Sequence, residues 1–78
     1  MAYLRVDLEN IIALCSQDEA DYDNPIALNL IDRCEKALAY RDISIRLTKR
    51  DKEFLATKYD EDMDWDAKRT LKTILNLY

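Results

Sequence analysis

Apolar residues recur at the spacing of amphipathic helices in four separate stretches of this chain. In the first stretch, the apolar stripe consists of Leu4, Leu8, Ile11, Ile12 and Cys15. The second stretch opens with Asn24 in the N-cap position and Pro25 at the first helical position, a combination that favours a helix start. Its stripe consists of Ala27, Leu30, Ile31, Cys34, Ala37 and Leu38.

The third and fourth stretches repeat this pattern. In the third, Thr48 and Asp51 have the spacing of a capping box, and the stripe consists of Phe54, Leu55 and Tyr59. The fourth stripe consists of Ala67, Leu71, Ile74, Leu75 and Tyr78. The pattern predicts an all-α fold over residues 1–78, a single domain of four short helices in two helical hairpins. Its core is expected to contain Leu8, Ile12, Leu30, Cys34, Phe54, Leu71 and Ile74.

One β alternative stays open. Residues 43–47 alternate between apolar and polar, as do residues 4–8, and both segments contain β-branched residues. A minor two-stranded β pairing of residues 2–6 with 43–47 would use both segments. Because residues 4–8 fit a helix equally well, we expect residues 42–47 to form an extended connector.

The composition excludes several kinds of catalytic and cofactor site. The chain has no Gly, so it lacks the residue that lets backbone approach a phosphate in P-loops and dinucleotide folds. It also has no His, the commonest general base and metal ligand. The alternating carboxylates from Asp60 resemble the start of a calcium loop, but Trp65 and Leu71 stand where an EF-hand needs Gly and Glu. We therefore expect that the protein is not an enzyme and that it has no cofactor or metal site.

The net charge of −4 conceals a segregation of charge along the chain. Residues 1–32 carry one base against seven acids, residues 33–58 carry eight bases against four acids, and residues 59–78 carry three bases against five acids. These segments can neutralise one another within the fold. The candidate nucleic-acid surface is the basic stretch that contains Arg41, Arg46, Lys49, Arg50 and Lys52.

Residues 47–59 resemble the opening helix of sigma-factor-like helix-turn-helix domains, in which a similar LTxRExxxLxxRY string recurs. The resemblance covers about thirteen residues. It implies a helical regulatory domain that binds DNA. The acidic turn that follows departs from that family because it would repel the DNA backbone, so no DNA-reading residues are carried over.

Trp65 is the residue that most suggests a contact with a partner. It lies about 135° from the centre of the fourth apolar stripe. Its indole therefore either folds back over the 60–64 turn near Tyr59 or stands partly exposed as an anchor for a basic partner. In the second case, the carboxylates around it are those of Asp60, Asp62, Asp64 and Asp66.

The remaining features concern compartment and assembly. Cys15 and Cys34 are offset by about 7.5 Å in the expected hairpin, which favours free core thiols over a disulfide. No segment approaches the ~20 apolar residues of a membrane span, so we expect a cytoplasmic protein without a membrane partner. Tyr3 and Val6, on the back of the first helix, favour a monomer or weak homodimer.

Together these observations predict a small protein-interaction module of the adaptor or inhibitor type. The alternative is a helix-turn-helix-like regulatory domain that binds nucleic acid through the 41–52 basic stretch.

Overall fold

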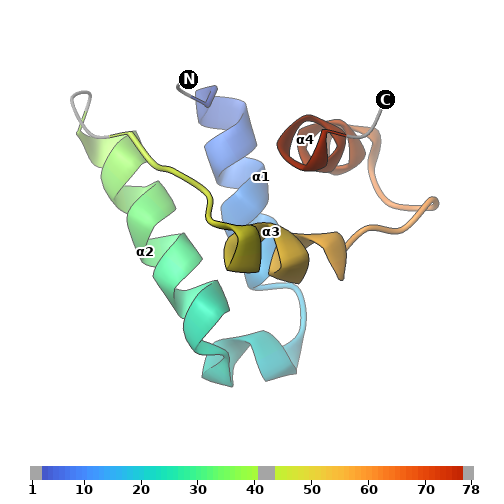
Figure 1. Ribbon diagram of the computed structural model, residues 1–78, viewed down its shortest axis with the longest axis horizontal. Coiled ribbons are helices and arrows are strands. Elements are labelled where there is room, and N and C mark those ends of the chain that lie inside the picture. The colour runs from blue at the N-terminus through green and yellow to red at the C-terminus, as the bar shows by residue number, and fades with distance from the viewer. Residues whose placement is uncertain (1–2, 41–43, 77–78) are drawn as a thin grey trace.

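The computed structural model describes residues 3–40 and 44–76 (Figure 1). In chain order, its elements are α1 (Arg5–Cys15), the 3-10 helix η1 (Glu19–Asp23), α2 (Pro25–Ala39), α3 (Lys49–Ala56) and α4 (Trp65–Leu75). The all-α bundle of four helices is thus confirmed. No strand occurs in the described part: residues 5–6 belong to α1, and residues 44–47 have no regular secondary structure. Residues 2 and 43 of the suggested β pairing lie outside the described residues.

Local side-chain chemistry explains where α2 and α3 begin. The Asn24 Oδ1 atom accepts a hydrogen bond of 2.9 Å from the Ile26 amide, and Pro25 occupies the first position of α2. Thr48 and Asp51 form a reciprocal capping box at the start of α3, with hydrogen bonds of 3.2 and 3.0 Å. Both starts are those that the sequence predicted.

The last helix ends without a glycine. Asn76 takes the left-handed conformation at the end of α4, with φ at 60°. Asn tolerates this region better than most residues because its short amide side chain can bond to nearby backbone. It therefore serves here in the position that Gly most often occupies.

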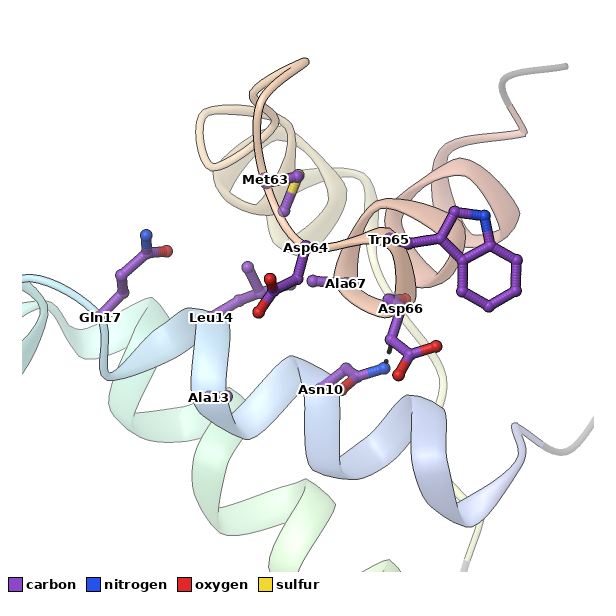
Figure 2. A pocket seen from close by; sticks show the side chains of 9 residues that line it. All are labelled: Asn10, Ala13, Leu14, Gln17, Met63, Asp64, Trp65, Asp66 and Ala67. Atoms are coloured by element: carbon purple, nitrogen blue, oxygen red, sulfur yellow. Dashed lines mark hydrogen bonds between the residues drawn. The ribbon is translucent and has the colours of Figure 1, made fainter.

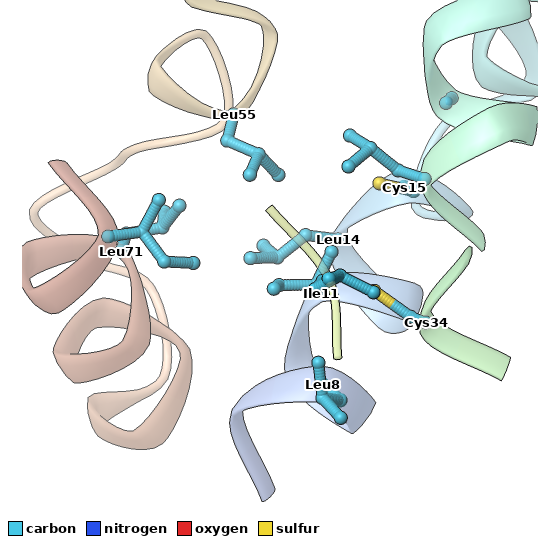
Figure 3. Packing of buried hydrophobic residues seen from close by; sticks show 11 residues of the cluster. Leu8, Ile11, Leu14, Cys15, Cys34, Leu55 and Leu71 are labelled. Carbon is cyan, nitrogen blue, oxygen red and sulfur yellow. The ribbon is translucent and has the colours of Figure 1, made fainter. Parts of the chain in front are cut away.

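The four helices pack as two hairpins around one core. In Figure 1, α1 and α2 lie side by side with η1 at their turn, while α4 lies on the other side of α1. Helix α3 contacts both α2 and α4. The buried apolar residues come from all four helices and from the connector before α3 (Figure 3). They are Leu8, Ile11, Leu14, Cys15, Ala27, Leu30, Cys34, Ile45, Leu55, Leu71 and Ile74.

Most of the expected core residues are buried, and two are not. Ile12 and Phe54 are only partly buried and pack against the edge of the core. Leu4 was placed on the buried stripe, but 64% of it is exposed because α1 begins only at Arg5. For the same reason, Tyr3 precedes α1 and packs against the core rather than lying on the back of the helix. Cys15 and Cys34 are free and buried, as expected.

Arg33 and Lys58 form partly buried ion pairs that connect distant segments. Arg33 Nη2 on α2 lies 2.8 Å from Asp51 Oδ2 on α3. Lys58 Nζ, just after α3, lies 2.8 Å from Asp21 in η1 and 3.0 Å from Asp18. The second set joins the acidic first segment to the basic middle segment, so part of the charge segregation is neutralised inside the fold.

Candidate functional site

The turn between α3 and α4 is held by its own side chains. Asp60 Oδ1 accepts a hydrogen bond of 2.9 Å from the Asp62 amide, which closes an Asx turn. Glu61 accepts hydrogen bonds of 2.9 Å from both the Tyr59 hydroxyl and Lys68 Nζ. These bonds tie the turn to α4 and fix where α4 begins.

The ion pair between Glu61 and Lys68 shifts the pKa of each partner in the direction that favours its charged form. The hydrogen bond from Lys68, followed by that from Tyr59, lowers the pKa of Glu61. The bond to Glu61 raises the pKa of Lys68 and, likewise, that of Tyr59. At neutral pH, Glu61 is therefore a carboxylate that is already paired with a cation, Lys68.

A polar network sets the position of α4 beside α1. The Thr70 hydroxyl donates a hydrogen bond of 2.8 Å to Asp7 Oδ1 and accepts one of 2.9 Å from Asn10 Nδ2. Asn10 Nδ2 also lies 3.4 Å from the Asp66 carbonyl oxygen. Asp7 and Thr70 are buried, so these bonds are shielded from water and define the helix pair.

Between α1 and the start of α4 lies an open groove with a volume of about 620 Å³ (Figure 2). One side of the groove is formed by Asn10, Ala13 and Leu14, which share one face of α1, and by Gln17 in the bend that follows α1. Its other side is formed by Met63, Asp64, Trp65, Asp66 and Ala67. The groove combines an apolar floor with carboxylates at its edge.

Trp65 stands at the edge of this groove with 70% of its surface exposed. The expectation that its indole covers the end of the third helix near Tyr59 is therefore wrong, and the exposed alternative is the one observed. In Figure 2, the indole points away from Met63 and Gln17. The Arg69 guanidinium lies 5.2 Å from the centre of the indole ring, one turn further along α4.

The aspartates around Trp65 are exposed and carry uncompensated charge. Within residues 3–40 and 44–76, no ion pair involves Asp60, Asp62, Asp64 or Asp66. Asp64 occupies the N-cap position of α4, but its side chain makes no capping hydrogen bond. In Figure 2, the carboxylates of Asp64 and Asp66 extend toward α1 instead.

A second hollow of about 410 Å³ adjoins the groove and shares Gln17 and Met63 with it. Its other lining residues are Asp18, Thr57, Lys58, Tyr59, Asp60 and Asp62. Only 9% of the Lys58 side chain is exposed, because it is bound by Asp18 and Asp21. The two hollows together form a surface whose accessible charges are mainly negative.

The basic stretch lies elsewhere, on the connector and on α3. Lys49, Arg50 and Lys52 are exposed on α3, and Arg46 is exposed just before it. None of these four forms an ion pair with a described residue. Arg41 lies outside the described residues. Asp51, which interrupts this stretch in sequence, is buried and paired with Arg33, so it does not reduce the exposed positive charge locally.

Of the residues that the sequence suggested as a partner contact, Asp64, Trp65 and Asp66 line the groove, whereas Asp60 and Asp62 line the adjoining hollow. The α1 side of the groove was not predicted. Asn10 and Gln17 look like ordinary solvated positions of an amphipathic helix. Their spacing with Ala13 and Leu14 marks a common helix face, but nothing in the sequence tells which helix packs beside that face. The missing information is the pairing of α1 with α4.

Two features are absent from the described residues. No group of three or more His, Cys, Asp or Glu side chains among them could hold a metal ion. No described helix is long and apolar enough to cross a bilayer. Comparisons of the chain with models of protein families, with curated proteins and with solved structures find no match. Statements on function therefore rest on the residues and geometry described above.

Proposed function

We propose that this chain is a small protein-interaction module of the adaptor or inhibitor type, which acts by binding and without catalysis. Its contact surface is Trp65 together with the adjoining groove between α1 and α4. The observation that carries the proposal is the 70% exposure of the only Trp in the chain. Covering that much indole on binding would contribute roughly 3–4 kcal/mol before the costs of association.

The surroundings of Trp65 favour a binding role. The Arg69 guanidinium lies over the indole at 5.2 Å from the ring centre, within the range of a cation–π contact. An indole held by such a contact loses less entropy when a partner covers it. The groove beside it supplies apolar surface from Ala13 and Met63, which lies next to the exposed carboxylates. Interface hot spots combine an aromatic anchor, an adjacent pocket and a polar rim in this way.

A cytoplasmic location is part of this proposal. Cys15 and Cys34 are free and buried. Free thiols are the usual state of cysteine in reducing compartments. The pair therefore supports a reducing environment for the module.

The test compares the proteins captured from an extract of the native host by wild type, Trp65→Ala and Tyr40→Ala. Tyr40 is the matched control because it is an aromatic residue 58% exposed at the far end of α2. We expect wild type and Tyr40→Ala to capture at least one protein in common. The amount of that protein should be about tenfold lower in the Trp65→Ala capture. The same set of proteins in all three captures would contradict the proposal.

The second candidate function is binding of nucleic acid through Arg46, Lys49, Arg50 and Lys52, with Arg41. Two observations support it: the side chains of Arg46, Lys49, Arg50 and Lys52 are exposed, and none of them forms an ion pair with a described residue. The discriminating measurement is retention on immobilised DNA as a function of salt. A steep salt dependence that Lys49→Gln/Arg50→Gln reduces, and that Lys36→Gln/Lys72→Gln does not, would favour this function. Absence of retention at low salt would exclude it.

A further inference from the structure

The groove between α1 and α4 accepts apolar side chains. Its floor contains Ala13, Leu14, Met63 and Ala67, and its volume of about 620 Å³ is within the usual range for binding pockets. A side chain such as Leu or Met that entered it would be covered by both helices. The groove thus offers an apolar contact that an exposed helix face alone would lack.

The charged residues that line the groove are all acidic, and Arg69, which lies 5.2 Å from the centre of the Trp65 indole, is not among them. None of the described residues that line the groove is Lys or Arg, whereas Asp64 and Asp66 lie at its edge. The Asp64 carboxylate is free for a ligand because it makes no capping bond to α4. Both carboxylates extend toward α1 (Figure 2). A positive group entering here would meet two carboxylates that have no other described ion pair.

The negative surface continues into the neighbouring hollow. That hollow adds Asp60 and Asp62, and its own cation, Lys58, is already held by Asp18 and Asp21. The two hollows meet at Gln17 and Met63. A ligand that follows both must therefore present more than one positive group, with an apolar group between or beside them.

From this complementarity we infer that the occupant of the groove is a Lys- or Arg-rich segment of the partner protein that carries an apolar anchor residue. This inference rests on the proposed function and adds the chemistry of the partner. The apolar residue enters the floor of the groove, while the neighbouring basic residues pair with Asp64 and Asp66. The exposed indole of Trp65 covers the part of the segment that leaves the groove.

The test is a selection of random peptides of about twelve residues on the immobilised wild-type protein. We expect the enriched peptides to carry more Lys and Arg than the unselected library, next to a large apolar residue. Enrichment of neutral or acidic peptides, or no enrichment, would overturn the inference. Binding of an enriched peptide is then measured by the fluorescence of Trp65, the single Trp of the chain.

Matched double variants assign the charge to the groove. Asp64→Asn/Asp66→Asn should lower the affinity for the enriched peptide by about fivefold or more at low salt. Asp23→Asn/Glu35→Gln removes the same charge from η1 and α2, and it should change affinity less than about twofold because the remaining effect is long-range and screened. Equal weakening by both double variants would mean that only net charge matters, and the inference would fall.

Two further outcomes separate the alternatives. If Trp65→Ala removes a captured partner but the enriched peptides are not basic, the interaction function stands and the basic-segment inference fails. If the protein self-associates at low salt and Asp64→Asn/Asp66→Asn abolishes that association, the occupant is the basic α3 surface of a second copy. That result would also overturn the inference of a separate basic partner.

Discussion

Two neighbouring side chains on α3 differ in how much they stabilise the fold. Leu55 has no exposed surface and lies in the centre of the core, where α3 faces α1 and α4 (Figure 3). Phe54 is half-buried at the edge, and Lys58 Nζ lies 5.4 Å from the centre of its ring. Apolar periodicity marks both residues as part of one stripe, but it does not tell which of them points to the centre.

This difference predicts the order of two truncations. Leu55→Ala should lower the free energy of unfolding by about 2–5 kcal/mol, because it leaves a cavity that the surrounding helices cannot fill. Phe54→Ala should cost less, since part of its ring already contacts water and the helix edge can relax. Urea melts of the two variants beside wild type measure both costs. A larger loss for Phe54→Ala than for Leu55→Ala would contradict the packing described here.

The two thiols should be unreactive in the folded protein. Burial raises the pKa of Cys15 to about 12 and that of Cys34 to about 11, and the nearby Cys34 thiol contributes to the first shift. Since the thiolate is the reactive form, Ellman's reagent should label both slowly at neutral pH and rapidly in denaturant. Immediate labelling of the native protein, or an intact disulfide in its mass spectrum, would be incompatible with buried free thiols.

At the scale of elements, the junction of α1 with α4 depends on Thr70. Its hydroxyl is both donor to Asp7 and acceptor from Asn10, and it is fully buried. Thr70→Val keeps the shape but removes both bonds, so the Asp7 carboxylate loses its buried donor. We expect a loss of about 1–3 kcal/mol in the free energy of unfolding.

The matched control for Thr70→Val is Thr73→Val, on the exposed side of the same helix. It should change stability by less than about 0.5 kcal/mol. NMR spectra of the two variants add a structural readout, because loosening of α4 should shift the amide signals of the groove residues. Equal stability of the two variants would show that the network does not hold α4 to α1.

The ion pair between η1 and the end of α3 predicts a dependence of stability on pH. Burial alone would raise the pKa of Asp21, but the hydrogen bonds from Lys58 and from the Asp18 amide hold it below its ordinary value. Burial likewise opposes the charge of Lys58, yet its bonds to Asp21 and Asp18 raise its pKa. The depressed carboxyl pKa stabilises the fold above the unfolded value of about 3.9, and this contribution is lost as the pH falls further.

Asp21→Asn tests this linkage. At pH 7 it should lower the free energy of unfolding by up to about 3 kcal/mol, since it leaves Lys58 with Asp18 alone. The gap between wild type and Asp21→Asn should narrow as the pH falls below about 4, where Asp21 is protonated first in the unfolded chain, and it should close below the lowered pKa of Asp21 in the folded protein. Asp23→Asn, an exposed neighbour in η1, serves as the control in the same urea melts. A gap that does not depend on pH would rule out the ion pair as its cause.

The helix starts show which features of an element can be predicted from the sequence. Asn24 with Pro25, and Thr48 with Asp51, use bonds within a few residues, so the local sequence is sufficient. The start of α1 has no such signal: Leu4 is its N-cap and makes no side-chain bond. The apolar spacing alone therefore included Leu4 in the helix one residue too early.

For the whole molecule, the limit of prediction is the pairing of helices far apart in sequence. The groove needs both α1 and the start of α4, and the groups that join these helices are polar. Asp7, Asn10 and Thr70 resemble solvent-facing residues in the sequence, and they become structural only when they meet. The same holds for Asp21 and Lys58, which are 37 residues apart in sequence and form an ion pair whose side chains are largely shielded from water.

The start of α1 and the end of α2 form a small apolar surface on the molecule. Leu4 and Val6 are exposed at the start of α1, and Tyr40 is exposed at the end of α2. These two helix ends are joined by a hydrogen bond of 3.0 Å from Arg5 Nη1 to the Leu38 carbonyl oxygen. A stable dimer buries about 800 Å² on each partner, far more than three side chains provide. Any homodimer formed through this surface should therefore be weak.

Sedimentation equilibrium over a range of protein concentrations tests this expectation. Wild type should be monomeric when dilute and associate at most weakly when concentrated, whereas Val6→Asp should stay monomeric throughout. Leu28→Asp introduces the same charge at an exposed apolar site near the start of α2, and it should behave like wild type. A tight dimer that survives Val6→Asp would exclude this end of the α1–α2 hairpin as the interface, and it would place self-association on another surface.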